Sequence, residues 1–258
     1  MSPAPLNLAS LLEALVPLIR AAGGEVMAVY STDFDVEKKG DDSPVTAADQ
    51  RAEQVILAGL ARLAPDVPVV AEEEVAAGRI PEVGERFWLV DPLDGTKEFI
   101  SRNGEFTVNI ALVEHGSPVL GLVYAPAVGR LFGGALGVGA WVEASGARRN
   151  IATRDVPAEG LTVVASRSHG DESALDAFLA GRAVASRTNA GSSLKLCLVA
   201  AGEADVYPRL GRTMEWDIAA GDAVLRAAGG IVKTVAGPVL KYGKPGFDNP
   251  HFAAWGRA

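Results

Sequence analysis

The densest group of side chains able to do chemistry lies in residues 91–96, Asp-Pro-Leu-Asp-Gly-Thr. An apolar run precedes them, so a strand would deliver Asp91 and Asp94 at its end. Gly95 permits a tight turn that could aim both carboxylates and the Leu93 carbonyl at one point. Hard cations such as Mg²⁺ prefer oxygen ligands of this kind. An Asp-rich turn without a metal explains the same residues equally well.

Three further acidic positions follow apolar runs or open predicted helices. Glu72 is the first acid after such a run, whereas the two acids behind it are better explained as a solvated loop. Asp217 lies near a predicted helix start, where aspartate is a common cap. The small residues after it would also let this helix end approach a backbone or a ligand closely. Asp49 follows Thr46 by three positions, and this spacing alone favours a capping box.

Together these four places predict a cluster of carboxylates from separate segments. Their repulsion in a dry site would be costly unless cations neutralised it. Two or more Mg²⁺ ions would do so, would clamp a phosphate and would activate a water. The chain has 3 histidines and 1 cysteine, which argues against zinc.

The composition limits the class of partner. The net charge of the 258 residues is −8 and no basic block stands out, so a nucleic-acid polymer is not expected as a partner. A small phosphorylated ligand fits, because a cation can reverse the local sign of an acidic pocket. The single cysteine, Cys197, excludes an internal disulfide and indicates a reducing compartment. It falls in an apolar stretch that predicts a buried helix.

Membrane insertion is not expected from the pattern. The start of the chain does not resemble a signal peptide. Residues 118–142 carry one charge, but prolines and glycines divide them into pieces too short for a membrane helix, so strands are predicted. We expect a cytoplasmic protein without a transmembrane segment, a monomer or homodimer, and we leave peripheral association with the inner membrane open.

The predicted elements divide the chain into an N-terminal α+β half, 1–150, and a C-terminal α/β half, 151–258. The first half holds the metal motifs; its predicted helices are 8–30 and 46–63, and its strands are 67–71, 87–90, 106–113, 119–124 and one or two within 131–142. In the second half strands and helices alternate: strands 161–165, 183–187, 204–207 and 231–235, and helices 172–179, 193–201 and 215–228.

Two motifs resemble the signatures of the inositol monophosphatase superfamily. They are residues 91–96 and residues 216–221, Trp-Asp-Ile-Ala-Ala-Gly, and they follow Lys39, Asp49 and the Glu72-Glu73 pair in matching order. The resemblance covers roughly 8–255 and implies an α/β fold of the layered αβαβα sugar-phosphatase type. The flanks 97–112 and 207–217 look like the bacterial CysQ type, a 3'(2'),5'-bisphosphate nucleotidase. That type converts adenosine 3',5'-bisphosphate to AMP and phosphate and so clears a by-product of sulfate assimilation.

The resemblance implies a role for each matching residue. Two or three Mg²⁺ ions would be held by Glu72, Asp91, the Leu93 carbonyl, Asp94 and Asp217. Thr96 with Glu72 would orient the attacking water, and Asp49 would support Thr96, which outweighs the capping-box explanation. The amides of Gly95 and Thr96 would hold the phosphate.

The second half would supply specificity for a nucleotide. A predicted helix start at 191–195, with spare amides, would suit the 5'-phosphate. By itself, His169 would be explained as a surface loop residue. Its segment resembles a nucleotide-contacting segment of the family, and this resemblance makes His169 a candidate substrate contact. The predicted substrate contacts in this half are His169, Gly191, Ser192, Lys195, Arg209 and Asp217, beside Glu72, Leu93, Asp94, Gly95 and Thr96 in the first.

The implied reaction is in-line attack by a metal-activated water on the 3'-phosphate. No phosphoenzyme is expected, since no nucleophile is indicated. Family members are commonly inhibited by lithium. Two alternatives stay open: the same chemistry on an inositol phosphate or another small sugar phosphate, and a non-catalytic protein that binds metal and phosphate.

Overall fold

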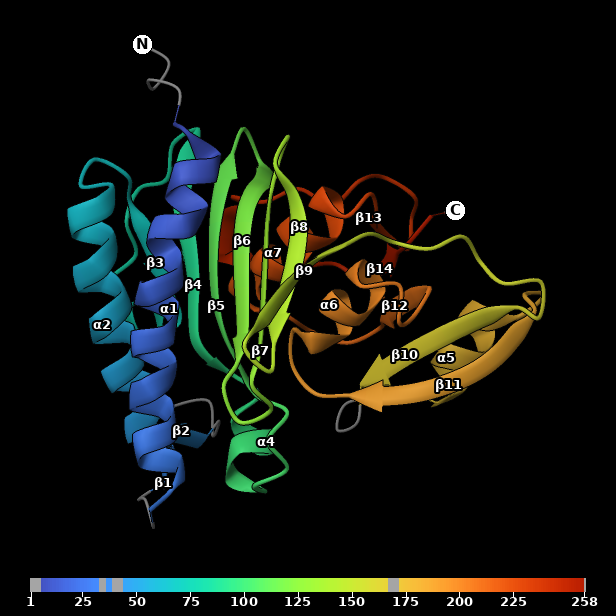
Figure 1. The fold of residues 1–258 in the computed structure, drawn as a ribbon, viewed down its shortest axis with the longest axis horizontal. Coiled ribbons are helices and arrows are strands. Elements are labelled where there is room, and N and C mark those ends of the chain that lie inside the picture. The colour runs from blue at the N-terminus through green and yellow to red at the C-terminus, as the bar shows by residue number, and fades with distance from the viewer. Residues whose placement is uncertain (1–5, 33–35, 39–43, 167–171, 258) are drawn as a thin grey trace.

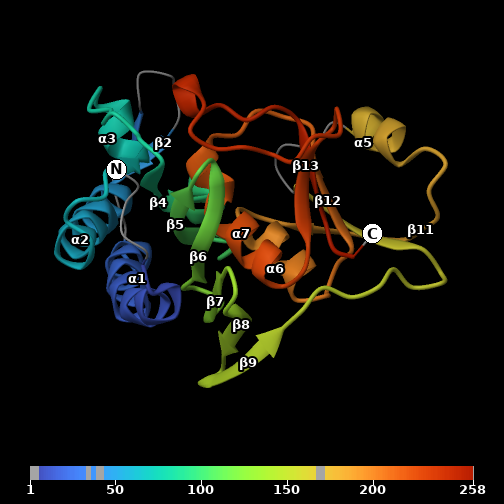
Figure 2. The same ribbon diagram turned by 90° about the horizontal axis from the view of Figure 1, so that it is seen from above.

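The computed structural model describes residues 6–32, 36–38, 44–166 and 172–257, which form five layers (Figure 1, Figure 2). Helices α1 (Leu8–Tyr30) and α2 (Ala47–Leu63) cover the outer face of a seven-stranded sheet. Helices α6 (Leu194–Ala200) and α7 (Glu215–Ala227) lie between it and a five-stranded sheet, whose far side carries α5 (Glu172–Leu179). The expected αβαβα order is therefore confirmed.

The seven-stranded sheet is antiparallel except for its first pair, β3 and β4. Its strands follow one another in chain order: β3 (Val69–Ala71), β4 (Arg86–Asp94), β5 (Thr107–Glu114), β6 (Ser117–Ala125), β7 (Arg130–Ala135), β8 (Gly139–Ala144) and β9 (Ala147–Ile151). Helices cover both faces of β5 and β6, which explains why these strands are apolar almost throughout. The predicted hairpin between them is confirmed; His115 and Gly116 make its turn with φ of 48° and 70°.

The five-stranded sheet has the order β11-β10-β12-β14-β13 and mixes parallel and antiparallel pairs. Its strands are β10 (Leu161–Ser166), β11 (Val184–Ala190), β12 (Val206–Arg209), β13 (Ile231–Thr234) and β14 (Phe252–Trp255). The short elements are β1 (Val36–Lys38), β2 (Pro44–Thr46), α3 (Glu72–Ala76), α4 (Thr96–Ile100) and the 3₁₀ turn η1 (Pro245–Phe247).

Most predicted elements are present within a few residues, and 118–142 forms strands as expected. Strands β1, β2, β9 and β14 and the short helices α3 and α4 are not among the predicted elements. Most of β9 is polar and exposed, so it lacks the apolar alternation that marks a strand, and pairing with β8 holds it in place. Strand β4 continues to Asp94 instead of ending at residue 90, because pairing with β5 resumes at Thr107 after a break in register.

The small residues after Asp217 let α7 lie directly on the seven-stranded sheet. A Cβ atom added to Gly121 of β6 would lie 2.3 Å from the carbonyl oxygen of Ala220. A Cβ added to Gly221 would lie 2.7 Å from Cβ of Leu196 on α6. Of the two explanations left open for these residues, close approach to a backbone is the one that the structure bears out.

Cys197 is buried in α6, as predicted, and burial raises the pKa of its thiol far above the usual range. Within the described ranges, no helix is both long and apolar enough to cross a membrane.

Candidate active site

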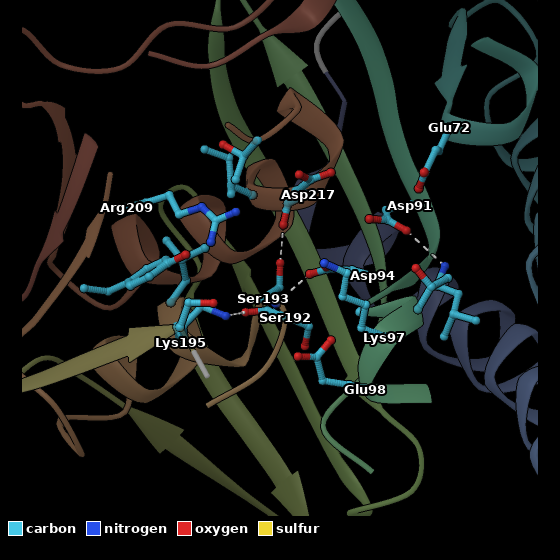
Figure 3. Close-up of a pocket in the computed structure, with 18 residues that line it drawn as sticks. Glu72, Asp91, Asp94, Lys97, Glu98, Ser192, Ser193, Lys195, Arg209 and Asp217 are labelled. Atoms are coloured by element: carbon cyan, nitrogen blue, oxygen red, sulfur yellow. Dashed lines mark hydrogen bonds between the residues drawn. The ribbon is translucent and has the colours of Figure 1, made fainter. Parts of the chain in front are cut away.

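A cavity of about 420 Å³ opens where the end of β4, the start of α7 and the segment before α6 meet (Figure 3). Its lining includes ten of the predicted residues: Glu72, Asp91, Leu93, Asp94, Gly95, Thr96, Ser192, Lys195, Arg209 and Asp217. Asp49 and Gly191 do not line it. His169 lies outside the described residues, as does Lys39.

The turn at 91–96 folds tightly at the end of β4. The amide of Leu93 donates to Oδ1 of Asp91 at 3.0 Å. Gly95 has a φ of 91°, in the left-handed region that favours glycine, and α4 begins at the next residue. A Cβ at this position would lie 3.2 Å from Oε2 of Glu98 and 3.3 Å from Cβ of Ser192. The glycine thus serves both the turn and the approach of the second half.

Glu72 opens the short helix α3 directly after β3, where it lines the cavity. A helix here replaces the solvated loop expected for the acids that follow. Glu74 is ion-paired with Arg79 at 2.6 Å near the surface. The amide of Glu73 donates to Oε2 of Glu53 at 2.9 Å. Burial raises the pKa of Glu53 to about 7.

Asp217 is both a cap and a lining residue of the cavity. The amide of Met214 donates to its Oδ2 at 2.9 Å, the bond expected of an acid in the first turn of a helix. Asp49 occupies the first turn of α2 and is 1% exposed. It lies near enough to Asp91 that its charge contributes to the raised pKa of that carboxyl.

Asp91 is buried, whereas Asp94 and Asp217 are half-buried. These three aspartates would repel one another if all were ionised. Burial raises the pKa of Asp91 well above its usual value, and the neighbouring Glu72 raises it further. Burial also raises the pKa of Asp94 to about 6, against the opposing effect of Lys195. The pKa of Asp217 is raised by burial and then by Asp94. This set of carboxyls favours neutralisation, either by protons or by a bound cation.

The donors present fit a hard divalent cation. The charged residues of the lining are five acids and three bases: Glu72, Asp91, Asp94, Glu98, Asp217, Lys97, Lys195 and Arg209. All donors on the acidic side are oxygens, as Mg²⁺ requires. No three described His, Cys, Asp or Glu side chains already stand in positions that could hold a metal ion.

The opposite wall carries two cations. Nζ of Lys195 donates to the carbonyl oxygens of Ser192 at 2.6 Å and Ala190 at 3.2 Å, and burial lowers its pKa to about 8. Arg209 donates to the carbonyl of Arg212 at 2.9 Å. Figure 3 shows Lys195 and Arg209 on one side of the cavity, with Glu72 and Asp91 on the other.

Ser192 adopts a strained backbone conformation beside these cations. Its φ is 44°, which is uncommon for a residue other than glycine. Its hydroxyl is buried and has no hydrogen-bond partner among the described residues. Strain of this kind is concentrated at ligand sites.

The expectation of spare amides before α6 is wrong for two residues. The amide of Gly191 donates to Oε2 of Glu105 at 2.9 Å. The amide of Ser193 donates to Oδ2 of Asp94 at 2.6 Å. Carboxylates of the first half already occupy the positions where an anion was expected, because the two halves are in direct contact there.

The sequence profile described as the inositol monophosphatase family matches residues 7–254. The chain belongs to the inositol monophosphatase family. This agrees with the resemblance of its two motifs and with the layered fold. The match covers both the carboxylate segments and the wall that carries Lys195 and Arg209, so the cavity lies wholly within the family region.

The chain is similar to two proteins named CysQ and, with lower identity, to an inositol monophosphatase of known structure. The chain is 49% identical to the 3'(2'),5'-bisphosphate nucleotidase CysQ of Escherichia coli K12, over 94% of this chain and 98% of that protein. The crystal structure of CysQ from Bacteroides thetaiotaomicron is 36% identical, with a TM-score of 0.82 over 98% of this chain and 100% of that one. The inositol monophosphatase of Anabaena sp. PCC 7120 is 28% identical, with a TM-score of 0.76 over 97% of this chain and 92% of that one.

The sequence interpretation assigned no individual site role to five residues of this site. Lys97, Glu98 and Tyr207 line the cavity. Ser193 and Asn109 lie behind the carboxylates and hydrogen-bond to Asp94. Lys97 and Glu98 directly follow the motif at 91–96, so their adjacency was an available signal. Asn109 and Tyr207 fall within the flanks 97–112 and 207–217, whose resemblance indicated the CysQ type but gave neither residue a role, and no pattern marks Ser193.

Proposed function

We propose that this protein is a Mg²⁺-dependent 3'(2'),5'-bisphosphate nucleotidase that hydrolyses adenosine 3',5'-bisphosphate to AMP and phosphate. The opposed charges of the cavity carry the proposal. Carboxylates that suit a cation lie on one side, and Lys195 and Arg209 lie on the other. A substrate with two separated phosphate groups matches this polarity. The 49% identity to the Escherichia coli nucleotidase supports the same substrate.

The metal side of the proposal assigns Glu72, Asp91, the Leu93 carbonyl, Asp94 and Asp217 to two or three Mg²⁺ ions. When bound, such ions neutralise charge on the transferred phosphoryl group and lower the pKa of a water. The chain's own oxygen donors fix where that charge is met.

The remaining residues bind and orient. Thr96, at the start of α4, and Glu72 orient the attacking water, and Asp49 supports Thr96 from α2. The amides of Gly95 and Thr96 hold the 3'-phosphate. Lys195 and Arg209 meet the second phosphate as charge partners. Ser192 and His169 complete the proposed nucleotide side.

A substrate panel tests the choice of substrate. Phosphate release would be measured with Mg²⁺ on adenosine 3',5'-bisphosphate, inositol 1-phosphate, fructose 1,6-bisphosphate and histidinol phosphate. We expect adenosine 3',5'-bisphosphate to give the highest kcat/KM. Equal or faster release from inositol phosphate would refute this substrate. No Mg²⁺-dependent turnover on any of the four would favour a non-catalytic binding protein.

A single amide substitution tests the metal site. Asp94→Asn keeps the shape and one oxygen acceptor but removes the charge, so activity should fall at least about 100-fold. Circular dichroism should show an intact fold. Asp176→Asn is the matched control, because Asp176 ion-pairs with Arg187 at the surface and its side chain is 61% exposed. Unchanged activity in Asp94→Asn would exclude Asp94 as a metal ligand.

A further inference from the structure

Ser193 contacts both carboxylate segments from a third part of the chain. It is 2% exposed and directly precedes α6. Its amide donates to Oδ2 of Asp94 at 2.6 Å, at the end of β4. Its hydroxyl donates to the backbone carbonyl of Asp217, in the first turn of α7. Figure 3 shows Ser193 between these two residues.

Asn109 fixes the direction of the Ser193 hydroxyl. Its Nδ2 lies 3.2 Å from Oγ of Ser193 and 3.5 Å from Oδ2 of Asp94, and the residue is fully buried in β5. A backbone carbonyl can only accept, so the one hydroxyl proton goes to Asp217. The hydroxyl oxygen then accepts from Asn109. The Ser193 hydroxyl and the Asn109 amide nitrogen are therefore each oriented by the partners that they contact.

We propose that the Ser193 hydroxyl, oriented by Asn109, is a positioning group that sets the separation between Asp94 and Asp217. The inference rests on the proposed function, which assigns both aspartates to Mg²⁺. Without the hydroxyl, the amide would still hold Asp94, but the backbone of Asp217 would lose its hydrogen-bonded link through Ser193 to Asp94. Partners behind metal ligands typically change affinity by about 10- to 100-fold.

The same link joins the two sides of the cavity. Ser192 precedes Ser193, and Nζ of Lys195 donates to the Ser192 carbonyl at 2.6 Å. A shift of Ser193 would therefore move the residues facing the nucleotide together with the carboxylates. The segment 192–195 thus contacts both sides of the cavity.

The test compares two buried hydroxyls that bind opposite ends of α7. Ser193→Ala removes the one at the start. Thr153→Val removes the other, since Oγ1 of Thr153 donates to the Ala228 carbonyl at 3.3 Å and the residue is 4% exposed. The Mg²⁺ concentration for the half-maximal rise in thermal midpoint would be measured without substrate, and that for half-maximal activity with it. Ser193→Ala should raise both about tenfold, and Thr153→Val should leave both within about twofold.

Two further variants make the result specific. Asn109→Ala should weaken the Mg²⁺ response in the same direction as Ser193→Ala, and the double variant should add little, because both act through one bond network. Ser193→Cys keeps a similar volume with a weaker donor and should fall between wild type and Ser193→Ala. If Ser193→Ala does not fold, Ser193→Cys tests the positioning role of the hydroxyl in its place.

The outcomes separate this inference from the proposed function. A wild type without any Mg²⁺ response refutes both. If the wild type responds to Mg²⁺ and Ser193→Ala responds at the same concentrations, the positioning role alone is overturned. If Ser193→Ala does not fold, a Ser193→Cys variant that equals the wild type has the same meaning. An equal loss in Thr153→Val overturns it as well, because the effect would then come from general loosening of α7.

Discussion

At the scale of residues, the site is a group of carboxyls held where ionisation is unfavourable. Asp94 is half-buried, and its Oδ2 accepts from the amide of Ser193 and the side chain of Asn109. Those donors and Lys195 favour the charged form, yet burial outweighs them. Ionisation of Asp94 in the folded chain therefore costs free energy, and a bound cation would offset that cost.

The stability of the metal-free protein should fall as the pH rises through about 6. The folded pKa of Asp94 is about 6 against 3.8 ordinarily, so the folded state binds this proton more tightly than the unfolded state. The stabilisation is complete below the unfolded pKa and is lost above the folded one; for Asp94 alone it corresponds to about 3 kcal/mol. The raised pKa values of Asp91 and Asp217 act in the same direction.

Thermal melts in a chelator would check this. The midpoint should be higher at about pH 5 than at about pH 7.5, and saturating Mg²⁺ should reverse the order. Asp94→Asn should flatten the dependence in the chelator. A midpoint that rises steadily with pH in the metal-free protein would contradict the prediction.

At the scale of elements, α7 determines the geometry of the site. Glu215, the first residue of α7, is fully buried and accepts from the amides of Gly243 at 2.7 Å and Lys244 at 3.0 Å. These bonds hold the helix start that carries Asp217. Farther along, α7 lies against β6, with Gly121 leaving room for the Ala220 carbonyl. The position of one carboxylate thus depends on packing along the whole helix.

Gly121→Ala should destabilise the protein through this contact. The new Cβ would lie 2.3 Å from a backbone oxygen, which cannot move without shifting α7. We expect a loss of about 3 kcal/mol in the free energy of unfolding, measured by urea denaturation. In the control Gly84→Ala, the Cβ has no heavy atom within 4 Å. Its change should stay within about 0.5 kcal/mol, and an equal loss in both variants would contradict the role of the contact.

The elements and the acidic residues differ in how far sequence could predict them. Helix α1 was predicted at both ends because its apolar positions recur with helical period, despite the internal Pro17. Asp91 and Asp94 stood out because two acids three positions apart follow an apolar run and because residues 91–96 resemble a family signature. Ser193 and Asn109 did not, since serine and asparagine are common polar types. Their role arises from a contact between positions 84 apart in the chain.

At the scale of the whole molecule, α7 is shared by both sheets. It packs against β4 to β8 on one side and against β13 on the other. We propose that 1–150 and 151–258 are halves of one cooperative unit, joined by this helix and by the segment before α6. The cavity lies at their junction, so catalysis requires both.

Residues 1–150 expressed alone should therefore fail to fold. The sheet face normally covered by α7 would be exposed, including the apolar strands β5 and β6, and such a surface favours aggregation. We expect the fragment to be insoluble or to bind a hydrophobic dye. The full chain should unfold in one transition by both far- and near-ultraviolet circular dichroism. A soluble, cooperatively melting fragment would show that the halves fold independently.

The burial of Cys197 has a practical consequence. The chain carries one thiol, and it lies inside α6 with its pKa raised. Because the thiolate is the reactive form, maleimides and disulfide reagents will not label the closed molecule. A cysteine introduced at the surface would consequently be the single reactive handle for a fluorophore or spin label. Slow labelling of Cys197 itself would report how often α6 opens.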